Sequence, residues 1–152
     1  MFTVHRETVA SPAQVWEVLA EGWLFPAWVV GASRVREVDP GWPGAEARLH
    51  HSVGVWPLLL DDTTSVITST PGRELALQAR GWPAGEARIE LRLEAAGSGC
   101  RITMAEDATH GPGRFVPTPL RKISIEPRNT ECLRRLVLLV EGHRVVPTLG
   151  ER

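Results

Sequence analysis

The fold is decided by the stretch Thr8-Val9-Ala10-Ser11-Pro12-Ala13-Gln14-Val15-Trp16-Glu17-Val18-Leu19, which reads as a strand end followed at once by a short amphipathic helix. Ser11 is a favourable N-cap residue, and Pro12 suits the first helical position, where its missing N–H costs no hydrogen bond. The apolar residues on one side of this helix are Val15, Trp16 and Leu19. Trp23 and Trp28 add more apolar surface than so short a helix needs, which predicts that it lies against a cavity or a broad sheet.

The composition is that of a globular protein, and we expect a single domain over residues 1–152 with a substantial core. Seventeen basic residues against eighteen acidic ones leave a net charge of -1. A basic face is typical of nucleic-acid-binding proteins, so we expect no nucleic-acid partner. The longest apolar run, Leu136 to Val140, is far shorter than the ~20 residues that span a bilayer, so we expect no integral membrane association.

The start of the chain has no basic segment followed by an apolar block, so we expect no signal peptide. Cys100 and Cys132 are the only cysteines, which makes a disulfide framework improbable and favours a cytoplasmic location. The sequence has no Cys-His spacing typical of zinc sites, no glycine-rich phosphate loop beside a strand and no Gly-x-Ser-x-Gly motif. We therefore expect no metal and no cofactor.

Alternating apolar and polar residues predict seven strands, over 2–9, 35–38, 47–53, 60–66, 75–79, 87–93 and 100–104. Two short helices are expected at 12–20 and 24–29, the second broken around Pro26, and a long helix from Glu126 to Glu141. Pro127 is tolerated only near a first turn or at a kink. Residues 119–125 are therefore expected to form either a separate helical turn or the first limb of a bent helix.

The element order predicts an α+β helix-grip fold. Short turns between consecutive strands dictate antiparallel neighbours. A sheet with one charged face must cover its other face, and only the long C-terminal helix is large enough to do so. We expect a curved antiparallel sheet of about seven strands wrapped around that helix, with two short helices after the first strand.

The sequence resembles the START-like polyketide cyclase/dehydrase (SRPBCC) group of helix-grip proteins. The segments that carry the resemblance are Ala10-Ser11-Pro12-x-x-Val15-Trp16, Trp28-Val29-x-Gly31, Asp39-x-x-Trp42-Pro43, His50-His51-x-Val53-Gly54, Pro57-Leu58, Asp62-x-Thr64 and Arg128-Asn129-x-x-x-Leu133-x-Arg135-Leu136. The resemblance implies an apolar cavity between sheet and long helix that binds lipids, polyketides, quinones or similar molecules; some members catalyse cyclisation or dehydration. Pro127 departs from the uninterrupted helix expected there.

His51 and Asp62 are the candidate catalytic residues. Side chains alternate along a strand, so His51 is expected to face inward with Leu49, and His50 outward. If the hairpin turns at Val55-Trp56, Leu49 lies opposite Asp62, and His51 is a diagonal neighbour of that carboxylate. The two side chains then form either an acid/base couple or a satisfied buried polar pair, and the sequence leaves both open.

The predicted ligand-binding residues are Trp23, Trp28, Leu49, Thr64, Met104, Glu106, Leu133 and Leu136. Trp23 and Trp28 are expected either to line the cavity entrance or to pack in the core. Glu106 is expected to face inward at the far end of the last strand, where it could close the cavity mouth or pair with Arg114. Trp56 and Trp82 each sit beside a proline in a turn and could form a hydrophobic rim.

Three functions follow as hypotheses. The first is binding of a hydrophobic small molecule, such as a lipid, polyketide or quinone-like compound, between sheet and helix. The second is a polyketide cyclase or dehydratase that uses His51 and Asp62 as acid/base groups. The third is a protein-interaction module that uses the Trp-rich loops. We expect a monomer or a homodimer.

Overall fold

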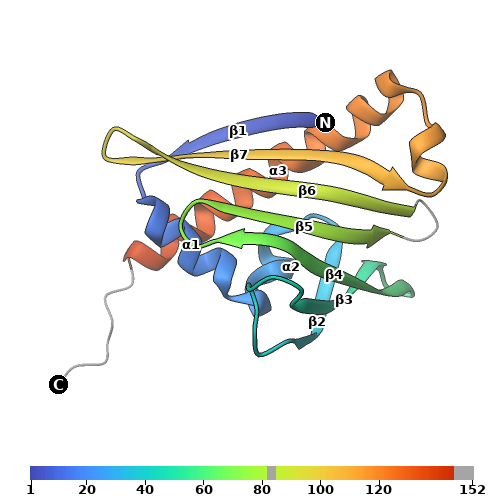
Figure 1. Ribbon diagram of the computed structural model, residues 1–152, viewed down its shortest axis with the longest axis horizontal. Helices are drawn as coiled ribbons and strands as arrows, with labels where there is room; N and C mark the ends of the chain where they lie inside the picture. Colours follow the sequence, from blue (N-terminus) through green and yellow to red (C-terminus); the bar gives the residue numbers. More distant parts are fainter. Residues whose placement is uncertain (82–84, 146–152) are drawn as a thin grey trace.

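The computed structural model describes residues 1–81 and 85–145, within which seven antiparallel strands form one curved sheet (Figure 1). Across the sheet the strands follow the order β1-β7-β6-β5-β4-β3-β2. The strands are β1 (Phe2–Thr8), β2 (Ala32–Val38), β3 (Arg48–Val55), β4 (Leu58–Thr70), β5 (Glu74–Gly81), β6 (Gly85–Ala96) and β7 (Gly99–His110). The helices are α1 (Pro12–Ala20), η1 (Gly22–Leu24), α2 (Phe25–Trp28), η2 (Pro112–Phe115) and α3 (Thr118–Val145). This is the predicted helix-grip fold.

Helix α1 begins where the opening stretch of sequence predicts. The Ser11 hydroxyl accepts a hydrogen bond from the Gln14 amide at 3.2 Å, and the Gln14 side chain accepts one from the Ser11 amide at 2.9 Å. These two bonds form a capping box, which satisfies amides that the first helical turn would otherwise leave unpaired. The capped helix buries Val15, Val18 and Leu19 in the core.

Helix α3 runs diagonally behind the long strands of the sheet, from near the end of β7 back toward α1 (Figure 1). Its buried side consists of Asn129, Cys132, Leu133, Leu136, Val137 and Val140, spaced three and four residues apart as expected for one helix face. The helix starts at Thr118 and continues through Pro127, so residues 119–125 belong to α3 and do not form a separate turn. The proline removes one backbone hydrogen bond, that to the carbonyl of Ile123. The helix also continues past Gly142 to Val145.

The register of the β3–β4 hairpin differs from the sequence prediction. Leu49 lies opposite Thr64, and His51 lies directly opposite Asp62. The prediction placed the turn at Val55-Trp56, whereas Val55 pairs with Leu58 and the turn contains Trp56 and Pro57. Moving the centre of a turn by one residue shifts the cross-strand partners by two, which explains the error.

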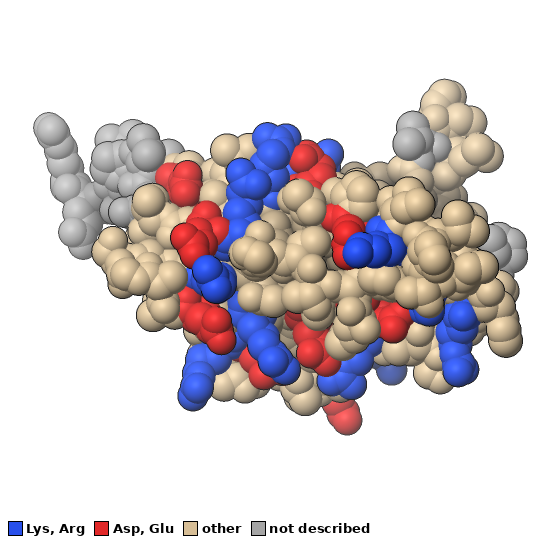
Figure 2. All heavy atoms as spheres, turned by 90° about the horizontal axis from the view of Figure 1, so that it is seen from above, with Lys and Arg blue, Asp and Glu red and all other residues tan. Residues whose placement is uncertain are grey.

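The edge of the molecule seen in Figure 2 carries acidic and basic side chains interspersed with one another. This mixture agrees with the net charge of -1. Among the described helices, none combines the length and apolar character needed to span a membrane.

Candidate functional site

The space between sheet and α3 is lined by inward-facing side chains that become smaller toward one end. On β5 the inward residues are Leu75, Leu77 and then Ala79; on β6 they are Leu93, Leu91, Ile89 and then Ala87. The register places Ala79 opposite Ala87, and Ala87 opposite Ala108 of β7. We call the region around this row of three alanines the open end, and the region filled by Leu75, Leu77, Leu91, Ile102, Leu133 and Leu136 the packed end.

A pocket of about 270 Å³ occupies the open end. Its walls come from β5, β6 and β7 on one side and from η2 and the start of α3 on the other. The lining residues are Ala79, Arg80, Gly85, Glu86, Ala87, Glu106, Ala108, Gly113, Val116, Arg121, Ser124 and Ile125. Ligand pockets usually start at about 300 Å³, so this one suits a small ligand.

Gly85 helps to shape this end, because its backbone adopts φ +113° and passes close to the carbonyl of His110. A Cβ at this position would collide with that carbonyl. The left-handed conformation also favours glycine over other residues. Any substitution of Gly85 would therefore strain the point where β6 begins beside the end of β7.

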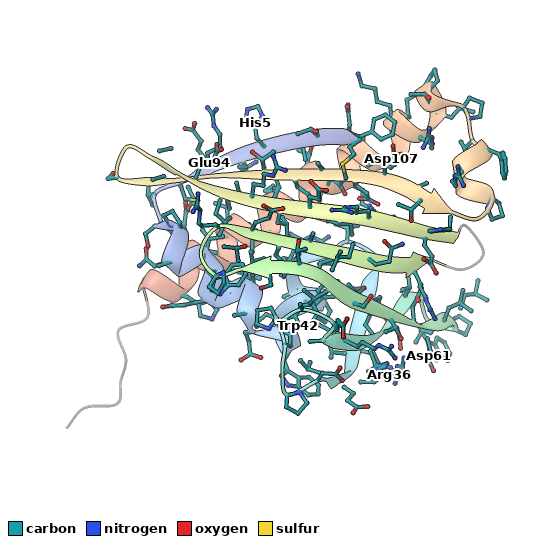
Figure 3. The ribbon with its side chains drawn as sticks, in the orientation of Figure 1. His5, Arg36, Trp42, Asp61, Glu94 and Asp107 are labelled. Carbon is teal, nitrogen blue, oxygen red and sulfur yellow. The ribbon has the colours of Figure 1, made fainter. Side chains whose placement is uncertain are left out.

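Two ion pairs join β7 to α3 beside the pocket. Glu106 is only 4% exposed, and both of its carboxylate oxygens accept hydrogen bonds from Nη2 of Arg128. Asp107, labelled in Figure 3 near the end of β7, accepts a hydrogen bond from Nη1 of Arg121 at 2.6 Å. The N-terminal ammonium of Met1 also lies 3.5 Å from Asp107, so this carboxylate pairs with two cations, whereas Glu106 pairs with Arg128. The sequence placed Glu106 inward but suggested Arg114, not Arg128, as its partner.

Of the predicted ligand-binding residues, Glu106 alone belongs to the pocket lining described above. Five others are fully buried in the core, where neighbouring side chains surround them: Leu49, Thr64, Met104, Leu133 and Leu136. Their part in ligand binding stays a prediction.

The tryptophans lie in different surroundings. Trp28 is buried, with its ring edge-on to that of Phe25 at a centroid distance of 5.5 Å. Trp23 is 58% exposed and Trp56 is 81% exposed. Trp42, labelled in Figure 3, donates from Nε1 to the carbonyl of Leu19 at 3.2 Å and so ties its loop to α1. The predicted rim included Trp82, which lies outside the described residues.

His51 faces inward, as predicted, and is 4% exposed. Its Nε2 lies 2.9 Å from the hydroxyl of Thr64, and its ring lies 5.3 Å from that of Phe25. Burial lowers the pKa of His51 below its usual value, while the nearby Asp62 carboxylate and the Ser52 backbone act in the opposite direction. No hydrogen bond of normal geometry from the described residues reaches Nδ1. Burial therefore favours the neutral form of the His51 imidazole.

Asp62 is half-buried, and its Oδ1 accepts a hydrogen bond from the amide of Thr63 at 2.7 Å. The structure thus brings the two candidate catalytic residues together as direct cross-strand neighbours. His51 itself hydrogen-bonds to Thr64. Neither residue lines the pocket at the open end.

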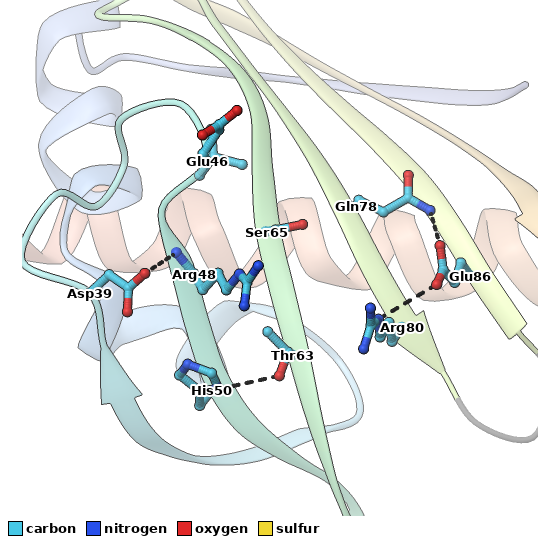
Figure 4. Close-up of a pocket in the computed structure, with 10 residues that line it drawn as sticks. Asp39, Glu46, Arg48, His50, Thr63, Ser65, Gln78, Arg80 and Glu86 are labelled. Atoms are coloured by element: carbon cyan, nitrogen blue, oxygen red, sulfur yellow. Dashed lines mark hydrogen bonds and ion pairs between the residues drawn. The ribbon is translucent and has the colours of Figure 1, made fainter.

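A second, larger pocket of about 770 Å³ lies on the opposite face of the sheet (Figure 4). Figure 4 shows α3 behind the strands, so the charged residues of this pocket point away from the helix. The lining includes His50, which faces outward as predicted, and the ion pair between Arg80 and Glu86 at 3.5 Å. This lining is polar and charged, so it is less suited to an apolar molecule than the open end.

The structure gives little support for metal binding or thiol chemistry within residues 1–81 and 85–145. These residues contain no group of three or more His, Cys, Asp or Glu side chains arranged to hold a metal ion. Cys100 and Cys132 are both free and buried, and burial raises the pKa of each thiol. Both cysteines therefore stay protonated near neutral pH.

The prediction missed the pocket-lining alanines and Arg121, Ser124 and Ile125 of α3. A signal for the alanines was present, because the inward rows of β5 and β6 both change from leucine or isoleucine to alanine at one end. Recognising a pocket required knowing that these ends pair, which depends on the register. The residues of α3 were missed because the helix was expected to be secure only from Glu126.

Residues 1–141 match the protein family described as polyketide cyclase / dehydrase and lipid transport. A search of curated proteins finds no match.

Solved structures with the same fold are numerous. Ara h 8.0201 is 14% identical with a TM-score of 0.72, over 93% of this chain and 97% of its own. Protein NE0264 from Nitrosomonas europaea is 16% identical with a TM-score of 0.74, over 95% of this chain and 96% of its own. The di-domain ARO/CYC StfQ from the steffimycin biosynthetic pathway is 10% identical with a TM-score of 0.73, over 95% of this chain and 51% of its own. At such identities the similarity establishes the fold alone.

Proposed function

The chain belongs to the polyketide cyclase / dehydrase and lipid transport family, and from this premise we propose that it binds a hydrophobic small molecule at the open end. One observation carries the proposal: the 270 Å³ pocket lies between sheet and α3, where three paired alanines leave the space that leucines fill elsewhere. Burying apolar ligand surface there supplies roughly 25 cal/mol for each Å² removed from water. The sequence predicts a lipid, polyketide or quinone-like ligand. A pocket of about 270 Å³ holds such a ligand only if it is compact, or holds one part of a larger ligand.

The proposal is tested by filling the pocket. The probe is N-phenyl-1-naphthylamine, an uncharged dye whose emission rises in apolar surroundings. We expect Ala108→Phe to weaken dye binding at least tenfold, because the new ring occupies the pocket. Ala105→Phe is the matched control: Ala105 is on the same strand, but it alternates with the inward-facing Met104 and Glu106 and so faces outward.

Equal dye affinity in wild type and Ala108→Phe, with Ala105→Phe also unchanged, would place binding elsewhere and contradict the proposal. Circular dichroism of all three proteins checks that the fold is retained. Native mass spectrometry of the protein purified from cells would then identify a co-purifying ligand, whose loss from Ala108→Phe is expected.

A second candidate function is acid/base catalysis by His51 and Asp62. The observation in its favour is that His51 is buried directly across the hairpin from the Asp62 carboxylate, that burial lowers its pKa, and that its Nδ1 meets no hydrogen-bond partner of normal geometry among the described residues. Such an imidazole can remove a proton from the carbon beside a carbonyl, the first step of many cyclisations and dehydrations. Because His51 lies outside the pocket lining, this function requires a ligand that extends from the open end across the sheet, past β4 toward β3.

Proton removal is measured by exchange in D₂O of the α-hydrogens of 2-acetylnaphthalene carrying an alkyl chain. We expect wild type to accelerate the exchange and His51→Gln to lose the acceleration while still binding the ketone. Equal loss of binding and exchange in His51→Gln would indicate a structural histidine.

A further inference from the structure

Three buried side-chain nitrogens of α3 have no hydrogen-bond partner among the described residues. They are Nε of Arg121, Nε of Arg128 and Nδ2 of Asn129. Buried polar groups in folded proteins are nearly always paired, and an unpaired donor costs free energy. Three such donors on one short segment therefore need an explanation.

The donors sit on the side of α3 that forms the pocket wall. Arg121 and Ile125 line the pocket, and positions 125, 128 and 129 follow at the three- and four-residue spacing of one helix face. Asn129 is 0% exposed and lies one turn deeper than Ile125. Arg128 is bonded to Glu106, which itself lines the pocket. Arg128 and Asn129 are not lining residues themselves: they lie next to Glu106, on the packed-end side of Ile125, just beyond the lining of the open-end pocket.

The acceptors of this cluster are already in use. Both oxygens of Glu106 accept from Arg128, and Oδ1 of Asn129 accepts a weak hydrogen bond from Arg128 at 3.4 Å. The two neighbouring donors, Nε of Arg128 and Nδ2 of Asn129, therefore have no acceptor left among the described residues. The charges next to Asn129 are also balanced, because Arg128 pairs with Glu106. A neutral acceptor therefore fits better than an anion.

We propose that Nδ2 of Asn129, together with Nε of Arg128, donates hydrogen bonds to a neutral carbonyl oxygen at the buried end of the pocket's ligand. This inference rests on the proposed function and adds the polar group that the ligand carries and the residues that select it. A bound carbonyl oxygen pairs donors that are otherwise buried without an acceptor, whereas a hydrocarbon of the same shape leaves them unpaired.

The test uses two probes of nearly identical shape, 2-acetylnaphthalene and 2-ethylnaphthalene, which differ by a carbonyl oxygen. We expect wild type to bind the ketone at least tenfold more tightly than the hydrocarbon. Asn129→Leu, which keeps the side-chain volume and removes the donor, is expected to bind both probes about equally while retaining the hydrocarbon affinity. Cys132→Ala, on the next turn of the same buried face, is the control and is expected to keep the preference.

Spectroscopy offers a direct reading of the contact, because Asn129 is the single asparagine of the chain. Selective ¹⁵N-asparagine labelling gives one side-chain NH₂ group to follow by NMR. We expect one of its protons to shift downfield when the ketone is added and to stay in place with the hydrocarbon. A merely structural asparagine would respond alike to both probes.

The outcomes separate the two proposals. Equal affinity of wild type for both probes, or a preference that survives in Asn129→Leu, would overturn the carbonyl inference and leave pocket binding intact. Failure of wild type to bind either probe, or the dye, would overturn pocket binding and the carbonyl inference together.

Discussion

The packed end and the open end lie between the same strands and the same helix, yet one is solid and the other hollow. On β7, Ile102 and Met104 fill the packed end, whereas Glu106 and Ala108 border the pocket two and four residues further along. The backbone is continuous through both ends, so the difference arises from side-chain volume. A helix-grip sheet therefore does not guarantee a cavity; the inward rows of residues decide where one can exist.

The largest expected effect comes from removing volume at the packed end. Leu136→Ala should lower the free energy of unfolding by about 2–5 kcal/mol, because Leu136 is fully buried and its loss leaves a cavity. Ile125→Ala at the open end should cost less than about 1.5 kcal/mol, because this side chain already borders a pocket. Urea denaturation of both variants measures the difference. Similar losses would mean that the open end is as tightly packed as the rest.

Enlarging a side chain should destabilise the packed core and not the open end, with a smaller effect on stability than removing a core leucine. Ala10→Leu introduces three carbon atoms at a position with 0% exposure in the core and should destabilise the protein by about 1–3 kcal/mol. Ala87→Leu, the same change in the pocket lining, should leave stability unchanged or raise it, because free space accommodates the side chain. Thermal unfolding of the two variants tests this. A clear loss in Ala87→Leu would contradict the pocket.

The smallest expected effect concerns the buried His51 in the core. Because its pKa is lowered in the folded state, the unfolded chain binds more protons below the usual histidine pKa. His51 should therefore reduce stability as the pH falls from about 6.5 toward the lowered pKa, by at most about 1.4 kcal/mol per pH unit for one proton. The pH dependence of urea unfolding should be shallower in His51→Gln over this range. An unchanged slope would indicate that His51 is not desolvated.

Much of the fold could be predicted because it follows from local patterns. Ser11 and Pro12 mark the start of α1, and alternation marks the strands. The candidate site was harder to predict from the sequence than the fold. His51 was placed inward by alternation alone, but its partner depended on a one-residue choice of turn at Trp56, and the prediction chose wrongly. Arg128 belongs to a motif that the sequence shows, but its hydrogen bond to Glu106 joins residues 22 positions apart. Local sequence patterns carry no information on such distant pairs.

By itself the sequence determined the elements, their order, the antiparallel sheet and the long covering helix, because capping, periodicity and short turns act between neighbours along the chain. Only the tertiary structure decided where the space lies and what borders it. The three alanines meet through the register of three strands, and Ile125 of α3 lines the same pocket only because the helix packs against the sheet there. Pockets and buried donors depend on distances between residues far apart in the chain, and these distances are set when the elements pack.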